Sequence, residues 1–132
     1  MSVELQALFG VATIMLALVL FQGALIPATY GFKWGLGPRD EPREPTALIG
    51  RTKRIVANHV EGMAMFVPLI LIAHFSGIST PLTQWGAIVF VAGRAAFAVI
   101  YMLGVPVLRS AAWGVAFTGL LMIGFELIRS GF

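Results

Sequence analysis

Four polar side chains recur at helical spacing in the second apolar stretch of the chain. They are Arg51, Arg54, Asn58 and Glu61. Their spacings of three, four and three residues place them within roughly an 80° arc of a helix that turns by about 100° per residue. Charged groups at membrane depth are costly, so each of them is a candidate for a functional site. The pattern predicts a helix with one polar face inside an otherwise apolar segment.

A second pair of polar residues, Arg94 and Tyr101, lies in the next apolar stretch. They are seven residues apart, so they also share one helix face. Counting from the helix ends opposite the charged loop, Glu61 and Arg94 each lie roughly 20 Å deep at about 1.5 Å per residue. Their matching depth predicts a Glu61–Arg94 ion pair between the two helices.

Two interpretations of this polar cluster remain open. An arginine–glutamate pair with an asparagine can hold helices together, and such bonds are modest in strength inside membranes. Alternatively, the cluster lines a polar pocket. Three arginines converging on one glutamate leave positive charge that an anionic ligand would neutralise. We favour the pocket, because helix association alone does not need so many cations on one face.

The other polar residues indicate structural roles. His59 lies about 80–100° away from the polar face, so we expect it to pack or to line an interface. His74 is expected at the membrane interface, and neither histidine has the neighbouring ligands that a metal site needs. Glu126 and Arg129 have the spacing of a pair at a helix end. The chain has no cysteine, which excludes disulfides, thiolate metal sites and a cysteine nucleophile.

Composition places these residues in a membrane protein. The chain has 132 residues, of which 58% are hydrophobic and 11% are charged, whereas a soluble domain has about 25% charged residues. The net charge of +3 suggests nucleic-acid binding at first sight. However, six of the nine Lys and Arg lie between residues 28 and 54, in and just after one loop between apolar segments of membrane length. We therefore expect membrane lipid, and no nucleic acid, as a partner.

Length and turn signals predict four spanning helices. A spanning helix needs about 20 apolar residues, and glycine, proline and charged residues interrupt the apolar stretches. The predicted helices cover about residues 3–27, 46–75, 82–103 and 108–128, with a charged loop at 28–47. The predicted fold class is an all-α integral membrane protein, a four-transmembrane-helix bundle that forms a single domain over residues 1–132. Transport is disfavoured, because the first and fourth helices carry almost no polar residues and no inverted repeat is seen.

The distribution of positive charge predicts the orientation in the membrane. Residues 28–54 hold six Lys or Arg, whereas the turn at 76–81 holds none. Cytoplasmic loops carry an excess of Lys and Arg. The 28–47 loop and Arg109 are therefore expected on the cytoplasmic side, with both termini outside the cytoplasm.

Two segments resemble the MAPEG family, the membrane-associated proteins in eicosanoid and glutathione metabolism. Residues 51–68, RTKRIVANHVEGMAMFVP, are similar to the family's R-x-x-R-x-x-x-N-x-x-E signature, and residues 93–113 resemble its third helix and the turn into the fourth. The loop sequence GLGPRDEP resembles short bacterial members. The resemblance covers essentially the whole chain. It implies a homotrimer of four-helix bundles, in a bacterial inner membrane rather than the endoplasmic reticulum.

The resemblance also implies a ligand and a reaction. Family members bind glutathione between neighbouring subunits, and the residues of this chain that would hold it are Arg51, Arg54, Asn58, Glu61, Arg94 and Tyr101. Arg109 resembles the arginine that stabilises the glutathione thiolate, which makes it the candidate catalytic residue. The implied function is a membrane glutathione transferase or peroxidase-like protein. It would conjugate glutathione, as co-substrate, to an apolar small molecule, without a metal.

Four positions depart from the family pattern. Gly62 and Phe97 stand where family enzymes often have tyrosine. Pro68 follows Glu61 by seven residues rather than three or four, and Arg109 comes about one residue later than expected. Two hydroxyl groups are therefore missing from the expected site. A second hypothesis stays open, in which the chain is a non-catalytic membrane scaffold or ligand-binding protein and the ionic cluster holds its subunits together.

Overall fold

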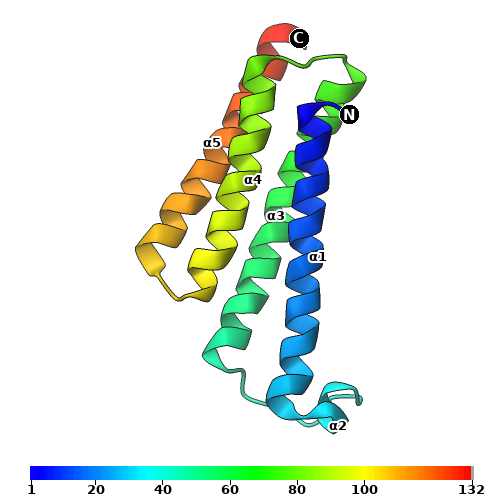
Figure 1. The fold of residues 1–132 in the computed structure, drawn as a ribbon, viewed down its shortest axis with the longest axis vertical. Coiled ribbons are helices and arrows are strands. Elements are labelled where there is room, and N and C mark those ends of the chain that lie inside the picture. The colour runs from blue at the N-terminus through cyan, green and yellow to red at the C-terminus, as the bar shows by residue number, and fades with distance from the viewer. Residues whose placement is uncertain (132) are drawn as a thin grey trace.

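Four long helices and one short helix form the secondary structure of residues 1–131 (Figure 1). The computed structural model describes residues 1–131. The helices are α1 (Val3–Tyr30), α2 (Phe32–Gly35), α3 (Ala47–Phe75), α4 (Pro81–Met102) and α5 (Pro106–Gly131). Each of the four long helices has the length and apolar composition to cross a membrane. The predicted all-α architecture with four long apolar helices is confirmed.

The first helix and the loop after it differ from the prediction. α1 continues through Pro27 to Tyr30 instead of ending near Pro27, because membrane helices tolerate proline where their surroundings satisfy the freed backbone groups. The helix ends at Gly31, whose N–H donates to the Pro27 carbonyl and whose φ of +87° suits glycine. The region 28–47, predicted as a loop, begins with the last residues of α1 and then the short helix α2.

Hydroxyl side chains cap the N-terminal ends of three of the long helices. Ser2, Thr46 and Thr80 each accept a hydrogen bond from the backbone N–H three residues later. At Thr80 the cap is reciprocal, since the Thr83 hydroxyl oxygen accepts from the Thr80 N–H at 2.9 Å. These caps satisfy N–H groups that a helix leaves free at its start. Local sequence therefore determines where α3 and α4, which carry most of the polar residues, begin.

Glycines let α4 and α5 pack at close range. A Cβ atom added at Gly93 would lie 2.6 Å from the Ala116 backbone nitrogen, and one at Gly119 would lie 2.5 Å from the Gly86 carbonyl oxygen. Small residues commonly allow membrane helices to approach this closely, so that backbone packing stabilises the pair. α4 and α5 form a hairpin that stands beside the α1 and α3 pair (Figure 1).

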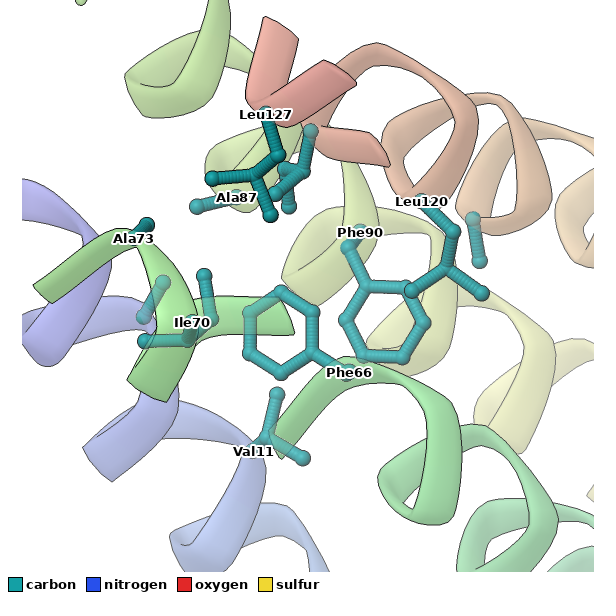
Figure 2. Packing of buried hydrophobic residues seen from close by; sticks show 11 residues of the cluster. Val11, Phe66, Ile70, Ala73, Ala87, Phe90, Leu120 and Leu127 are labelled. Atoms are coloured by element: carbon teal, nitrogen blue, oxygen red, sulfur yellow. The ribbon is translucent and has the colours of Figure 1, made fainter. Parts of the chain in front are cut away.

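An apolar core joins all four long helices in the half of the bundle near the chain termini. Figure 2 shows Val11 of α1, Phe66 of α3 and Leu120 of α5 around this core. The rings of Phe66 and Phe90 are stacked, with centroids 4.2 Å apart. Large apolar side chains are also exposed on the outer faces of all four long helices, which suits contact with lipid. The polar residues of α3 and α4 lie mainly in the other half of the bundle.

Candidate functional site

The predicted polar residues line one groove between α3 and the α4–α5 hairpin, toward the end of the bundle that carries the 28–47 loop. Three hollows in a row make up the groove. The middle one shares Asn58 and Trp113 with the hollow beside Arg94, and it shares Tyr101 and Arg109 with the hollow at the loop end. All seven residues singled out from the sequence line it: Arg51, Arg54, Asn58, Glu61, Arg94, Tyr101 and Arg109. We call this surface the arginine groove. The fold brings these residues together from three different helices.

Tyr101 contacts two arginines at the loop end of the arginine groove. The Arg54 Nε–H donates to the Tyr101 hydroxyl oxygen at 2.8 Å. The guanidinium carbon of Arg109 lies 4.3 Å from the centre of the Tyr101 ring, where a cation is attracted by the ring quadrupole. Because the hydroxyl oxygen accepts from Arg54, the O–H of Tyr101 is available to donate to a ligand.

Three guanidinium groups surround a hollow at this end of the groove without a carboxylate. Its volume is about 210 Å³, and its lining residues are Ala47, Arg51, Arg54, Tyr101, Gly104, Pro106 and Arg109. Arg51 lies against the α4–α5 turn, because a Cβ atom on Gly104 would be 3.2 Å from Arg51 Nη1. Like charges held this close repel one another, so the hollow favours an anion that pairs with several arginines at once.

Arg94 is buried deeper in the groove and has one unpaired nitrogen. The residue is 2% exposed. Its Nη1 donates to Asn58 Oδ1 at 2.8 Å and its Nε to His59 Nδ1 at 3.4 Å, while Nη2 has no partner within residues 1–131. A buried donor left unsatisfied costs about 1–3 kcal/mol. A carboxylate ligand would remove this cost, because guanidinium and carboxylate groups form parallel hydrogen bonds.

The predicted direct ion pair between Glu61 and Arg94 is wrong. No nitrogen–oxygen distance between the two side chains falls within 4.0 Å. Asn58 links them instead, because it accepts from Arg94 and donates its Nδ2–H to Glu61 Oε2 at 3.4 Å. The equal depth of Glu61 and Arg94 specifies where they lie along their helices, but it does not specify how each helix is rotated about its own axis. That rotation leaves Glu61 at the exposed rim of the groove and buries Arg94.

His59 is a neighbour of the groove that the sequence pattern did not assign to it. As predicted it is a packing residue, with only 1% of its surface exposed. Its ring also joins two helices, since Nδ1 accepts from Arg94 and Nε2 lies 3.1 Å from the Val11 carbonyl oxygen of α1. Because Arg94 can only donate, we assign the ring proton to Nε2. The sequence offered one general indication of this role, since a histidine buried among apolar helices needs hydrogen-bond partners for both ring nitrogens.

Two carboxylates at the opposite end of the bundle have structural roles. Glu4 is buried and accepts hydrogen bonds from the hydroxyls of Thr83 at 2.6 Å and Ser79 at 3.0 Å, which ties α1 to the start of α4. The sequence pattern indicated no role for Glu4. The predicted pair of Glu126 and Arg129 is confirmed, with Nη2 and Oε1 2.8 Å apart. Neither carboxylate lines the arginine groove.

The charged side chains of the groove are not a set that binds a metal ion. Glu61 is its single carboxylate, and its other charged side chains are arginines. Across residues 1–131, no group of three or more His, Cys, Asp or Glu side chains could hold a metal ion. Arginine has no acceptor atom, so the groove suits an anionic organic molecule better than a cation.

Comparison with known protein families covers nearly the whole chain. The MAPEG family matches residues 7–129. The chain belongs to the MAPEG family. This confirms the resemblance drawn from the 51–68 and 93–113 segments, and the MAPEG family includes glutathione transferases and peroxidases. A search of curated proteins and a search of solved structures each found no match. With four apolar helices, this MAPEG protein is an integral, multi-pass membrane protein.

Two positions where this MAPEG chain lacks a tyrosine both lie beside Arg94. A Cβ atom on Gly62 would lie 3.6 Å from the Arg94 guanidinium carbon. The centre of the Phe97 ring lies 4.8 Å from the same carbon. Glycine and phenylalanine offer no hydrogen bond at these places. Arg94 is therefore packed rather than paired there, and its hydrogen-bonding capacity stays available to a ligand.

Proposed function

We propose that this MAPEG protein is a membrane-embedded glutathione transferase that conjugates glutathione to apolar electrophiles. The observation that carries the proposal is the hollow at the loop end of the arginine groove. Three arginines surround it and no carboxylate neutralises them. Glutathione is a small anion with two carboxylates, and the MAPEG family typically uses it. Charge and family therefore favour the same ligand.

Each charged group of glutathione has a complementary residue in the groove. Arg51 and Arg54 are placed to pair with its carboxylates, and bidentate pairs of this kind are strong. Arg94 offers the unpartnered Nη2. Glu61, exposed at the rim and hydrogen-bonded only through Asn58, offers a carboxylate to the ammonium group. Tyr101 can donate its O–H to a remaining carboxylate or carbonyl oxygen.

Arg109 is proposed to act on the reacting sulfur. The thiol loses its proton, the thiolate attacks an electrophilic carbon, and the leaving group departs with the bonding electron pair. A free thiol has a pKa of about 8.5, and a nearby cation lowers it. Arg109 sits over Tyr101 at the junction of two hollows of the groove, where it can stabilise the thiolate. The remaining rate gain would come from holding the two reactants together.

The apolar part of the groove is proposed to receive the electrophile. Beside Arg94 the groove is walled by Met65, Phe90, Trp113 and Phe117. The rings of Trp113 and Phe117 are stacked with centroids 5.2 Å apart, and both side chains are partly exposed. An apolar compound dissolved in the bilayer could reach this wall from the side. It would then lie next to the arginines that hold glutathione.

The proposal includes the assembly and the orientation. Arg54 and Glu61 are exposed in the single chain, and polar groups at membrane depth must face protein or water rather than lipid. A homotrimer whose subunits meet along α3 would cover them and place the groove at a subunit boundary. The six cations between residues 28 and 54 favour the loop side as cytoplasmic, and a bacterial inner membrane as the location.

Calorimetry and turnover test the proposal together. Glutathione titrated into the detergent-solubilised protein should give a saturable heat signal. A chlorinated aromatic compound should then be conjugated faster than in buffer. The double variant Arg51→Gln/Arg54→Gln should bind at least about tenfold more weakly, since a hydrogen bond to a charged group is worth about 1.5–3 kcal/mol. The control is Lys53→Gln, which removes a charge from the same helix outside the groove. Absence of both heat and turnover in the wild type would contradict the proposal.

A second function, non-catalytic ligand binding or scaffolding, is favoured by one observation. The groove lacks hydroxyl groups at Gly62 and Phe97, which both contact Arg94. The same measurements separate the two functions, because a pure binding protein would give the heat signal without turnover. A scaffold whose ionic cluster only holds subunits together would give neither.

A further inference from the structure

A second large hollow lies between α1, the 28–47 loop and the start of α3. Its volume is about 460 Å³, and it shares no lining residue with the arginine groove. One wall is a mainly apolar face of α1 that carries Val19, Gly23 and Ile26 beside Gln22, and the rim carries Arg39, Arg43 and Lys53. The hollow thus combines an apolar wall at membrane depth with three cations at the end of the membrane span.

No carboxylate lines this hollow, although Asp40 and Glu41 line the adjoining hollow on the loop, which shares Arg39 and Arg43 with it. Lys53 is exposed and forms no ion pair within residues 1–131. Arg43 lies 3.6 Å from Glu41, but both side chains are exposed, and such pairs contribute little. Arg39 is held in place by the Gly35 carbonyl, which accepts from its Nε at 2.9 Å and its Nη2 at 2.6 Å. Inside the hollow the rim therefore carries three cations and no acidic group, which attracts an anion.

Two aromatic residues hold the loop beside the hollow. The Tyr30 hydroxyl donates to the Glu44 carbonyl oxygen at 2.7 Å, and the Trp34 Nε1–H donates to the Glu41 carbonyl oxygen at 2.9 Å. The two rings meet edge to face with centroids 5.0 Å apart. Tyrosine and tryptophan are enriched at the level of lipid headgroups. The cationic rim is therefore expected at headgroup level, on a loop that is already anchored.

The stretch of α1 from Val19 to Tyr30 matches the depth of one lipid leaflet. Tyr30 comes eleven positions after Val19, which is roughly 16 Å at about 1.5 Å per residue. Half of a hydrocarbon core of about 30 Å is about 15 Å. At Gly23 the wall has open space, since an added Cβ atom would meet nothing within 4 Å. An acyl chain can therefore lie along α1 while its headgroup stays at the rim.

We propose that this hollow binds an anionic phospholipid from the leaflet on the loop side. Arg39, Arg43 and Lys53 would hold the phosphate, and an acyl chain would lie along Val19, Gly23 and Ile26. The proposal is independent of glutathione binding, because the two surfaces share no residue.

Retention of phosphatidylglycerol tests the charged part of the site. The protein is reconstituted in nanodiscs with equal amounts of phosphatidylglycerol and phosphatidylcholine, and the retained lipid is counted by native mass spectrometry. The wild type should retain phosphatidylglycerol preferentially. Arg43→Gln/Lys53→Gln should reduce this preference about tenfold or more, as expected for two interfacial cations. The control Lys33→Gln removes a charge from the same region outside this hollow and should leave most of the preference intact.

A glycine substitution tests the apolar part without changing charge. Gly23→Leu would fill the acyl-chain path, and the open space around Gly23 means that the fold can accept the side chain. It should lower lipid retention, whereas Gly124→Leu, at another open glycine on α5, should not.

Four results would overturn the proposal. Equal retention of the two lipids in the wild type would show that the hollow does not select an anion. Equal losses in Lys33→Gln and Arg43→Gln/Lys53→Gln would show diffuse attraction rather than a site. Displacement of the lipid by soluble glycerol phosphate, or retention unaffected by Gly23→Leu, would show that the acyl chain does not contribute.

Discussion

Arg54 and Arg109 contact the same tyrosine but are expected to act at different stages of the reaction. Arg54 can pair with a carboxylate that is charged in both the ground state and the transition state, so its loss should mainly raise KM. Arg109 would act on the sulfur, whose negative charge is required for attack, so its loss should lower kcat. Both arginines contact Tyr101, so replacing either one changes the same part of the groove and the two variants can be compared directly.

We predict that Arg54→Ala raises KM for glutathione about tenfold with little change in kcat, and that Arg109→Ala lowers kcat about tenfold or more. These sizes follow from about 1.5–3 kcal/mol for a hydrogen bond to a charged group. Steady-state kinetics with a chlorinated aromatic electrophile provide the measurement. If both variants lose only affinity, Arg109 is not the group that stabilises the thiolate.

His59 offers a second prediction at the scale of single atoms. Its Nδ1 accepts from Arg94 and its Nε2 bonds to the Val11 carbonyl, so it is a positioning residue that acts through Arg94. An asparagine oxygen can take the place of Nδ1, whereas a glutamine side chain reaches the place of Nε2. We therefore expect His59→Asn to keep glutathione affinity and His59→Gln to weaken it about tenfold. Each variant loses one hydrogen bond, so their melting temperatures should be similar. Equal affinities in the two variants would contradict the positioning role.

At the scale of helices, the glycines between α4 and α5 determine how closely the hairpin packs. That hairpin carries Arg94, Tyr101 and Arg109, so its position relative to α3 sets the width of the arginine groove. Most helix positions gain stability when glycine is replaced by alanine, by about 1 kcal/mol. At a close backbone contact the added methyl group must instead displace the neighbouring helix.

We predict that Gly93→Ala destabilises the protein by about 1–3 kcal/mol, the usual cost of overpacking. The reason is that the added Cβ atom would lie 2.6 Å from the Ala116 backbone nitrogen. The matched control is Gly124→Ala on α5, where a Cβ atom meets nothing within 4 Å, and it should be neutral or slightly stabilising. Thermal unfolding in detergent measures both. A Gly93→Ala variant as stable as the wild type would mean that the two helices separate easily.

At the scale of the whole molecule, the single chain leaves a polar surface at membrane depth. Arg54 and Glu61 are exposed on it, and a second copy is the simplest protein surface that could cover them. We predict that the protein is a homotrimer in mild detergent. Native mass measurement counts the subunits directly, and a stable monomer would remove the basis for a site shared between subunits.

The orientation of the molecule gives a further prediction. The chain has no cysteine, so a single introduced cysteine is a unique label site. Glu44→Cys in the charged loop should react with a membrane-impermeant thiol reagent only from the cytoplasmic side. Ser76→Cys, after α3, should react only from the opposite side. Reversed labelling would contradict the predicted topology.

Local properties of the chain made much of this protein predictable from its sequence. Apolar length and turn residues determined the four long helices, because a membrane span requires a set number of apolar residues. Helical periodicity placed Arg51, Arg54, Asn58 and Glu61 on one face. The groove contains all seven predicted residues because faces of this kind cannot point into lipid, and the family followed from the spacing of the same residues.

The tertiary structure decided what depends on how the helices rotate and approach one another. It placed Asn58 between Glu61 and Arg94, where the sequence predicted a direct ion pair. It joined His59 to Arg94, and Glu4 to residues 75 or more positions away. Periodicity specifies which residues share a face but not which face of the next helix they meet. These contacts depend on how far each helix is rotated about its own axis, which the packing of the whole bundle determines.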